Sequence, residues 1–187
     1  MARSGSSTMV DYPPDRITGP RLVLRPPVLD DAGALFQRVA RDPEVTKYLL
    51  WAPHPNVAAT RRVITEKLNV SDDERTWAIE LKHGGDVIGL TSCRRPAPHS
   101  VEIGYCLGRR WWGKGYMAEV LDLLLAALEA DRGVYRVWAT CHVDNERSAR
   151  LLERAGFGLE GRLVRQAVYP TMGPEPQDAL MYAKVLR

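Results

Sequence analysis

The sequence Arg109-Arg110-Trp111-Trp112-Gly113-Lys114-Gly115-Tyr116-Met117-Ala118-Glu119-Val120 decides the fold of this chain. An apolar strand, residues 101–107, is expected to lead into it, and an amphipathic helix, residues 117–130, to follow it. Glycine lets a backbone approach a ligand closely, and the first N–H groups of a helix lack partners within the helix. Because the helix dipole also favours an anion there, the stretch predicts a phosphate-binding turn, assisted by Lys114 and the paired arginines. A plain Gly-x-Gly turn is the alternative.

The chain before this turn predicts antiparallel strands. Residues 21–25 alternate between polar and apolar side chains and are bounded by prolines. Residues 75–81 also alternate, Gly84-Gly85 supplies a turn, and residues 86–93 return as the second arm of a hairpin. Residues 75–81, 86–93 and 100–107 therefore predict three successive antiparallel strands.

The chain after the turn predicts a parallel pair of strands. The helix over residues 117–130 ends near Gly133, and residues 134–143 have the composition of a buried strand. A strand, a helix and a strand at this spacing imply a right-handed crossover, and ligands of such sheets lie outside the carboxyl ends of parallel strands. Further helices are expected from Asp30 past Val39, from Pro43 as the first helical residue to Tyr48, over residues 56–69 and after Asn145. Further strands are expected over residues 159–168 and 178–186.

Length and charge indicate a single domain without a nucleic-acid partner. The 187 residues are enough for one sizeable core, and 26 basic against 23 acidic residues give a net charge of only +3. Residues 1–17, which are rich in Ser, Gly and Pro, are interpreted as a flexible N-terminal tail, and residues 18–187 as the folded domain.

Cysteine use and hydropathy indicate a cytoplasmic protein. Cys93, Cys106 and Cys141 are scattered and form no CxxC pair, which fits a reducing compartment. The N-terminus lacks the apolar segment of a signal peptide, and no run of about 18 apolar residues predicts a transmembrane helix, so no membrane partner is expected. The four histidines form no metal-binding set, so no metal is expected.

A second polar pair follows one strand after the turn. Asn145 and Ser148 are spaced i to i+3 at a helix start, where they can face a ligand or cap the helix's own N–H groups. The glycine turn lacks the spacing of a Walker A loop and the third glycine of a Rossmann fingerprint. We therefore interpret the glycine turn as a site for the pyrophosphate of a nucleotide-like cofactor, although it belongs to neither of these two motifs.

Three motifs share their spacing with one known family. They are Glu102-Ile103-Gly104-Tyr105, Arg110-x-x-Gly113-x-Gly115 with Tyr116 and Ala118-Glu119, and Asn145-x-x-Ser148-x-Arg150-Leu151-Leu152-Glu153-x-x-Gly156-Phe157-x-x-Glu160-Gly161. This pattern resembles the GNAT superfamily of N-acetyltransferases, and most closely the branch that acetylates the N-terminal alanine or serine of ribosomal proteins. The resemblance covers about residues 17–187.

The resemblance implies an α+β fold with a single mixed central sheet of about seven strands, an antiparallel meander followed by a splayed parallel pair, flanked by about four helices. It also implies acetyl-CoA as cosubstrate, lying where the strand 100–107 separates from the strand 134–143. The residues implied to hold acetyl-CoA are Tyr105, Cys106, Leu107, Arg110, Trp111, Trp112, Gly113, Lys114, Gly115, Tyr116, Asn145 and Ser148.

The same resemblance implies direct attack of an amine on the thioester, without an acyl-cysteine at Cys106. A general base must deprotonate the ammonium. Glu102 is the first candidate, although it could instead form an ion pair on the sheet face, and Glu80 and His142 are reserves. A backbone N–H near Cys106 is implied as the oxyanion donor. Ser148, with Asn145 beside it, is implied to protonate or orient the leaving thiol.

The acceptor is expected between two loops. Residues 51–55 supply Trp51 and His54, and the Pro-rich residues 169–176 begin with Tyr169; the alternative for Trp51 is simple packing. The strand residues Trp77 and Glu80 complete the expected acceptor set. These loops carry aromatics more than acids, which favours a protein or peptide N-terminus over a small amine such as an antibiotic, polyamine or amino acid. A non-catalytic acyl-CoA-binding sensor module is the alternative class, and the chain is expected to be a monomer or homodimer.

Overall fold

The computed structural model describes residues 13–187, which form an eight-stranded sheet in the order β1-β2-β3-β4-β5-β6-β8-β7. The strands are β1 (Ile17–Thr18), β2 (Leu22–Arg25), β3 (Glu74–Leu81), β4 (Val87–Ala97), β5 (Ser100–Leu107), β6 (Arg136–His142), β7 (Gly158–Val168) and β8 (Pro176–Val185). The first five strands are antiparallel neighbours in chain order, and among them β3, β4 and β5 are the three that the hairpin spacing predicts.

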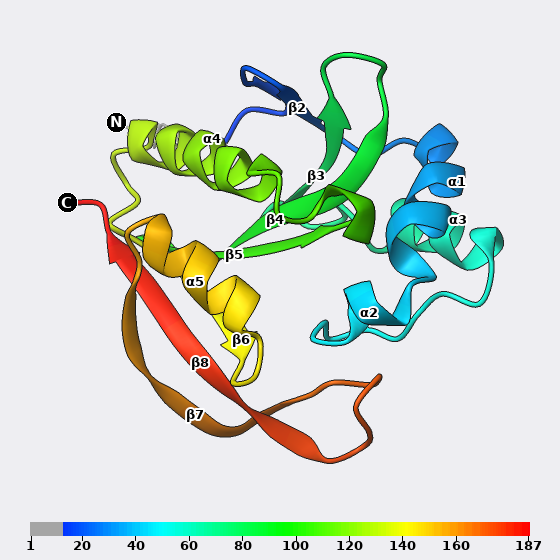
Figure 1. The fold of residues 1–187 in the computed structure, drawn as a ribbon. Helices are drawn as coiled ribbons and strands as arrows, with labels where there is room; N and C mark the ends of the chain where they lie inside the picture. Colours follow the sequence, from blue (N-terminus) through cyan, green and yellow to red (C-terminus); the bar gives the residue numbers. More distant parts are fainter. Residues whose placement is uncertain (1–12) are drawn as a thin grey trace, which may run out of the picture.

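Helices cover both faces of this sheet (Figure 1). They are α1 (Ala32–Leu35), which continues into a π-helical turn (Phe36–Ala40), α2 (Pro43–Thr46), α3 (Val57–Glu66), α4 (Tyr116–Ala130) and α5 (Glu146–Arg154), with 3₁₀ turns at Leu29–Asp31 and Arg109–Trp111. One apolar cluster joins α4 and α5 to the sheet, and a second joins α1 and α3 to it. The sheet therefore separates two cores.

α4 supplies much of the larger core. Val120, Leu121, Leu124 and Leu128 recur at helical spacing and are each at most 1% exposed. Full burial of one leucine stabilises a fold by roughly 1.5–3 kcal/mol. This apolar face fixes α4 across the sheet, and it thereby fixes the glycine turn at the N-terminus of the helix.

β5 and β6 are the parallel pair, and α4 is the crossover between them. Only residues 100–102 of β5 pair with residues 136–138 of β6. β6 goes on pairing with β8 as far as His142, whereas the described residues show no further pairing between β5 and β6. The sheet therefore opens as a V between the carboxyl ends of β5 and β6.

The structure confirms the α+β class, the antiparallel meander and the splayed parallel pair. The described residues form eight strands and five α-helices, close to the expected seven and four. The additional strand is β1, whose two residues are too few to carry an alternating pattern. The short helix expected from Pro43 is confirmed, with Asp42 as its cap, and the helix before it ends in a π-helical turn.

The N-terminal segment reaches the sheet before the expected boundary at residue 18. Residues 1–12 of the expected tail lie outside the described residues. Within the remainder, the Pro14 carbonyl accepts a hydrogen bond from the Trp77 indole at 3.2 Å, and Ile17 pairs with Leu24. Residues 13–17 are therefore part of the packed structure. In the described chain, no helix combines the length and the apolar surface that crossing a bilayer requires.

Candidate functional site

The glycine turn leads directly into α4. Gly113 and Gly115 have φ angles of +71° and +75°, which L-residues with side chains rarely adopt. Gly115 is the N-cap of α4, and among the described residues no side chain caps this helix. The first N–H groups of α4 are therefore available to a ligand, and the helix dipole favours an anionic one.

Arg21 braces the turn from one side. Its guanidinium donates to the carbonyls of Lys114 and Gly115, both at 3.0 Å, and pairs with Glu119 at 2.7 Å. In a trans peptide, the N–H of the following residue points away from the C=O. Holding these two carbonyls therefore directs the N–H groups of Gly115 and Tyr116 away from Arg21 and toward the open side of the turn.

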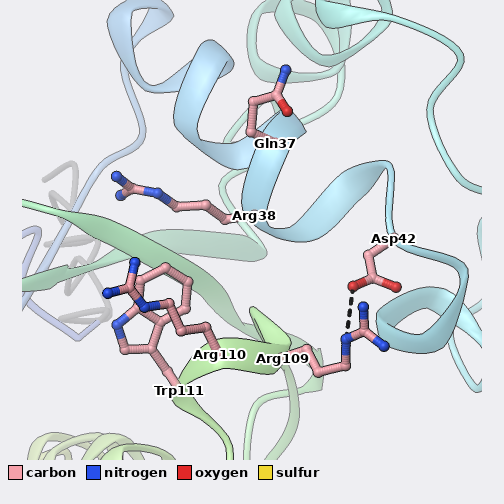
Figure 2. A pocket seen from close by; sticks show the side chains of 6 residues that line it. All are labelled: Gln37, Arg38, Asp42, Arg109, Arg110 and Trp111. Atoms are coloured by element: carbon pink, nitrogen blue, oxygen red, sulfur yellow. Dashed lines mark ion pairs between the residues drawn. The ribbon is translucent and has the colours of Figure 1, made fainter.

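A hollow of about 430 Å³ lies beside the turn (Figure 2). Its lining comes from the helical segment before α2 and from the 3₁₀ turn, namely Gln37, Arg38 and Asp42 with Arg109, Arg110 and Trp111. Arg109 pairs with Asp42 at 3.3 Å, and Arg38 pairs with Asp86 at 2.6 Å. Arg110 is exposed and has no ion-pair partner among residues 13–187, so it is the guanidinium left available to a phosphate.

The edge of β5 that faces the V carries free backbone groups. The Gly108 N–H donates to the Ile88 carbonyl of β4 at 2.8 Å. Because backbone groups alternate in direction along a strand, the Cys106 amide also faces β4, and the amides of Tyr105 and Leu107 face the V. The N–H donor expected near Cys106 is therefore best supplied by one of these two neighbours.

Tyr105 and Ser148 meet across the V. Their hydroxyl oxygens lie 2.8 Å apart. Burial raises the pKa of the Tyr105 phenol well above its usual value, although the hydrogen bond with Ser148 opposes part of this rise. The phenol therefore stays protonated at neutral pH and can donate to Ser148. The Asn145 side chain accepts from the Ser148 N–H at 3.2 Å, so it caps α5, as the capping interpretation predicts.

The two tryptophans of the turn have different environments. Trp112 donates from its indole to the Leu107 carbonyl at 2.6 Å, and Arg147 at the start of α5 lies 4.2 Å from its ring centroid. This contact joins the turn to α5 across the mouth of the V. Trp111 is only 8% exposed and packs in the larger core, and its N–H bonds to the Gly108 carbonyl. Its side chain also lines the hollow beside the turn, so the expectation that Trp111 contacts the cofactor stays a prediction.

Glu102 lies where β5 and β6 begin to separate. It is opposite Arg94 in the β4–β5 ladder, and its carboxylate accepts from the Arg94 guanidinium, with one contact at 3.0 Å. This is the ion pair that the sequence allows as the alternative to a general base. The carboxylate side chain is 24% exposed, so the pair does not close it off from solvent.

Burial governs the cysteines near the V. It raises the pKa of the Cys106 thiol to about 11, and it also raises the pKa of the Cys141 thiol, which hydrogen-bonds to Ser148. Thiols in such environments are poor nucleophiles at neutral pH. This agrees with the expectation of direct transfer without an acyl-cysteine.

Trp51 and His54 form a packed unit in their loop. Their ring centroids lie 5.2 Å apart, and Trp51 packs against the smaller core. His54 shares a 2.8 Å hydrogen bond with Thr60 of α3, and burial lowers its pKa. The packing interpretation of Trp51 is therefore confirmed, and an acceptor role for either residue stays a prediction.

Of the residues expected to bind the acceptor, Trp77 is corrected, whereas Glu80 forms an ion pair and its acceptor role stays a prediction. Trp77 is fully buried in the larger core, where its indole donates to Pro14, so it has no surface for an acceptor. Glu80 forms an ion pair with Arg25 at 2.5 Å, and Arg25 also pairs with Asp31 at 2.8 Å. Glu80 therefore belongs to a charge network that anchors the start of the first helical region.

Tyr169 lies at the end of β6, with His142 and Tyr48. The His142 ring stacks on Tyr48 at a centroid distance of 5.0 Å and meets Tyr169 edge-on at 4.8 Å. The loops that carry the two tyrosines are also joined, because the Thr171 hydroxyl reaches the Thr46 carbonyl at 3.5 Å. The C-terminal loop and the segment after α2 therefore meet at this histidine.

A larger hollow, of about 1000 Å³, lies at the opposite end of β5 and includes none of the predicted site residues. It is lined by the start of β3 and the β4–β5 turn, including Glu74, Pro96 and Pro98. Residues 13–187 contain no cluster of potential metal ligands.

Sequence patterns do not reveal several of these contacts. The sequence indicates only that Arg21 begins a strand, and no residue near it predicts its hydrogen bond to Lys114, 93 residues later. The meeting of Tyr48 with His142 is likewise a product of tertiary packing. The pairing of Tyr105 with Ser148 was accessible in part, since both residues lie in the motifs that indicate a cofactor site.

Comparisons with known proteins agree with this geometry. The family described as Acetyltransferase (GNAT) domain matches residues 21–158. A relative from Bacillus licheniformis, named uncharacterized N-acetyltransferase p20, is 33% identical over 147 residues, which is 76% of this chain and 82% of the relative. The chain belongs to the GNAT acetyltransferase family.

Two further similarities concern ribosomal proteins. The [ribosomal protein uS5]-alanine N-acetyltransferase of Escherichia coli is 33% identical over 75 residues, which is 40% of this chain and 39% of that protein. The solved structure of RimL, a ribosomal L7/L12 alpha-N-protein acetyltransferase in complex with coenzyme A, matches with a TM-score of 0.79 at 24% identity and covers 91% of this chain and 97% of its own. The second similarity is one of fold.

The environment of Cys106 predicts slow alkylation. With a thiol pKa of about 11, the thiolate fraction is small at neutral pH and rises as the pH approaches that value. At a pH of about 7.5, iodoacetamide is expected to modify Cys106 roughly 100-fold more slowly than free cysteine. Digestion and mass spectrometry of the Cys106 peptide measure this rate, and a rate that levels off near pH 8 contradicts the assignment.

Proposed function

We propose that this GNAT acetyltransferase moves the acetyl group of acetyl-CoA directly to the α-amino group of a protein or peptide N-terminus in the cytoplasm. The observation that carries the proposal is the V between β5 and β6, which has an unfilled helix N-terminus at its mouth and the Tyr105–Ser148 pair inside it.

The residues of the turn fit a diphosphate. Gly113 and Gly115 open the backbone, Arg21 fixes the direction of the amides, and Arg110 and Lys114 supply positive charge. The V-facing amides of Tyr105 and Leu107 suit the amide groups of an extended pantetheine chain, which would add as a strand along β5. Acetyl-CoA supplies an acetyl thioester, whose carbonyl carbon is the electrophile.

Each proton has a proposed route in this account. Glu102 takes one proton from the acceptor ammonium, directly or through water, and leaves a neutral amine that attacks the thioester carbon. The V-facing amide of Tyr105 or Leu107 donates to the carbonyl oxygen as negative charge develops there. The new N–C bond replaces the C–S bond, and the nitrogen releases its second proton to water. The Ser148 hydroxyl, itself hydrogen-bonded to Tyr105, gives its proton to the departing sulfur and regains one from water.

The choice of a peptide N-terminus rests on the relatives and on the expected acceptor region. One relative is named for the alanine of ribosomal protein uS5, and one neighbour for the α-amino group of ribosomal L7/L12. In this chain, the rings of Tyr48 and Tyr169 lie against His142 at the end of β6, and the described residues form no cluster of acidic side chains there. A polycationic small amine would be better served by acidic side chains.

An acceptor panel tests the proposed function. Free-thiol release from acetyl-CoA is measured with tripeptides that begin with Ala, Ser or Gly, and with spermidine, an aminoglycoside and free amino acids. Release with a peptide, and an N-terminally acetylated product by mass spectrometry, is the expected result. Release with only a small amine would replace the acceptor class. Binding of acetyl-CoA without release from any amine would favour a non-catalytic sensor.

Paired variants test Glu102 as the general base. Glu102→Gln is expected to lower kcat by roughly 10²–10⁴-fold, because a general base of this kind contributes that much, while acetyl-CoA affinity stays nearly unchanged. Arg94→Gln removes the same ion pair but leaves the carboxylate, so kcat should stay within about threefold of wild type. Steady-state thiol release measures both. Equal losses in the two variants would assign Glu102 to the ion pair alone.

A further inference from the structure

His142 is buried in an unusual way for a polar residue. It is only 1% exposed, and within the described residues its Nε2 is the buried side-chain nitrogen or oxygen that has no hydrogen-bond partner. Leaving a buried polar atom unpaired is costly, and most native structures avoid it. The aromatic rings of Tyr48 and Tyr169 that surround the imidazole offer only weak acceptors.

The other ring nitrogen fixes the tautomer. The backbone N–H of Asp144 donates to His142 Nδ1 at 3.1 Å, so Nδ1 acts as an acceptor. The Asp144 carboxylate is 3.8 Å from Nδ1, beyond hydrogen-bond length, and its side chain is 71% exposed. In a neutral imidazole with Nδ1 as acceptor, the proton is on Nε2. The unpaired atom is therefore a donor.

The position of His142 matches the acceptor side of the reaction. Cys141, the preceding residue, packs in the larger core and hydrogen-bonds to Ser148. Because successive strand residues face opposite sides of a sheet, His142 faces the other side, where it meets Tyr48. The leaving thiol and the acceptor would then occupy opposite sides of the end of β6.

We propose that the Nε2–H of His142 binds the first carbonyl oxygen of a peptide acceptor, between the rings of Tyr48 and Tyr169; this inference rests on the proposed function. The donor requires an acceptor atom in the ligand, and the nearby Asp144 carboxylate disfavours an anionic one. Aromatic faces attract an ammonium group, and Lys47 already places one 5.1 Å from the Tyr48 centroid, so the ammonium of the acceptor is assigned to the Tyr169 ring. A peptide N-terminus presents an ammonium and a neutral carbonyl oxygen on adjacent carbons, so it fits both features. Because Tyr169 is only 3% exposed, this binding requires a shift of its ring.

The test compares two ligands and matched variants. His142→Phe keeps a ring of similar shape but removes the donor, and His142→Gln keeps an N–H donor. His83→Phe, on the exposed β3–β4 turn, is the control. The tripeptide Ala-Gly-Tyr and isopropylamine, which has the same branched carbon but no carbonyl, are titrated by calorimetry onto each protein saturated with CoA, and thiol release from acetyl-CoA is measured in parallel.

The tripeptide is expected to bind His142→Phe about tenfold more weakly than wild type, because one hydrogen bond is lost. A tenfold change in affinity corresponds to about 1.4 kcal/mol. His83→Phe should match wild type, His142→Gln should lose less, and isopropylamine binding should not distinguish the variants. His142→Phe should also melt at or above the wild-type temperature, because it removes an unpaired buried donor.

Three outcomes would overturn the assignment. The first is equal tripeptide affinity in wild type and His142→Phe, and the second is an equal loss of affinity for the tripeptide and for isopropylamine. The third is a fall in kcat without a change in tripeptide affinity, which would indicate proton transfer. If His142→Phe does not fold, the comparison of His142→Gln with wild type on the two ligands decides in the same way. If tripeptide binding depends on His142 but no thiol is released from acetyl-CoA, the proposed function is wrong and this inference is still supported.

Discussion

The hydrogen bonds from Arg21 to the carbonyls of Lys114 and Gly115 are the constraint on which the site depends. They connect Arg21, which immediately precedes β2, to the turn that follows β5. They also direct the backbone amides of Gly115 and Tyr116 toward the open side of the turn. The same guanidinium pairs with Glu119 in the first turn of α4. Arg21, at the start of the matched family region, and Glu119, 98 residues later, thus hold one short turn, and its glycines allow the backbone shape that this requires.

The division of the sheet gives the site its two sides. α4 must cross from β5 to β6, and the two strands then pair only over residues 100–102 and 136–138. The open edge of β5 and the Tyr105–Ser148 contact lie within the resulting V, whereas His142 meets Tyr48 on the opposite face of the end of β6. The proposed donor and acceptor sites therefore lie on different sides of the end of β6, an arrangement compatible with direct transfer.

The sequence predicted the fold well, because strands and helices are specified by patterns among neighbouring residues. Alternation located β2, β3 and β5, and helical spacing located α4 to within one residue at its start. Asn145 was identified as a cap from its position alone. The site was predicted less completely, because burial and long-range contacts decide it. Trp77 reads as a strand aromatic, and only packing shows that it lies wholly within the core.

Charged residues illustrate the same limit. Glu80 and Glu102 both read as available carboxylates, yet each has an arginine partner on a neighbouring strand, Arg25 and Arg94 respectively. Strand register decides such pairs, and a sequence gives register only approximately. The unpaired nitrogen of His142 has no signature in the sequence either, since it depends on the tautomer set by the Asp144 amide.

The central claim is that the glycine turn holds the diphosphate of acetyl-CoA, and calorimetric titration of two glycine variants tests it most directly. Gly113 and Gly85 have nearly the same φ, +71° and +69°, and space is open around both, so a Glu at either position meets the same backbone strain. Only Gly113→Glu places a negative charge in the turn. The account predicts that Gly85→Glu binds acetyl-CoA like wild type and that Gly113→Glu binds it at least about 100-fold more weakly, through charge repulsion at close range. Equal affinity in the two variants would contradict it.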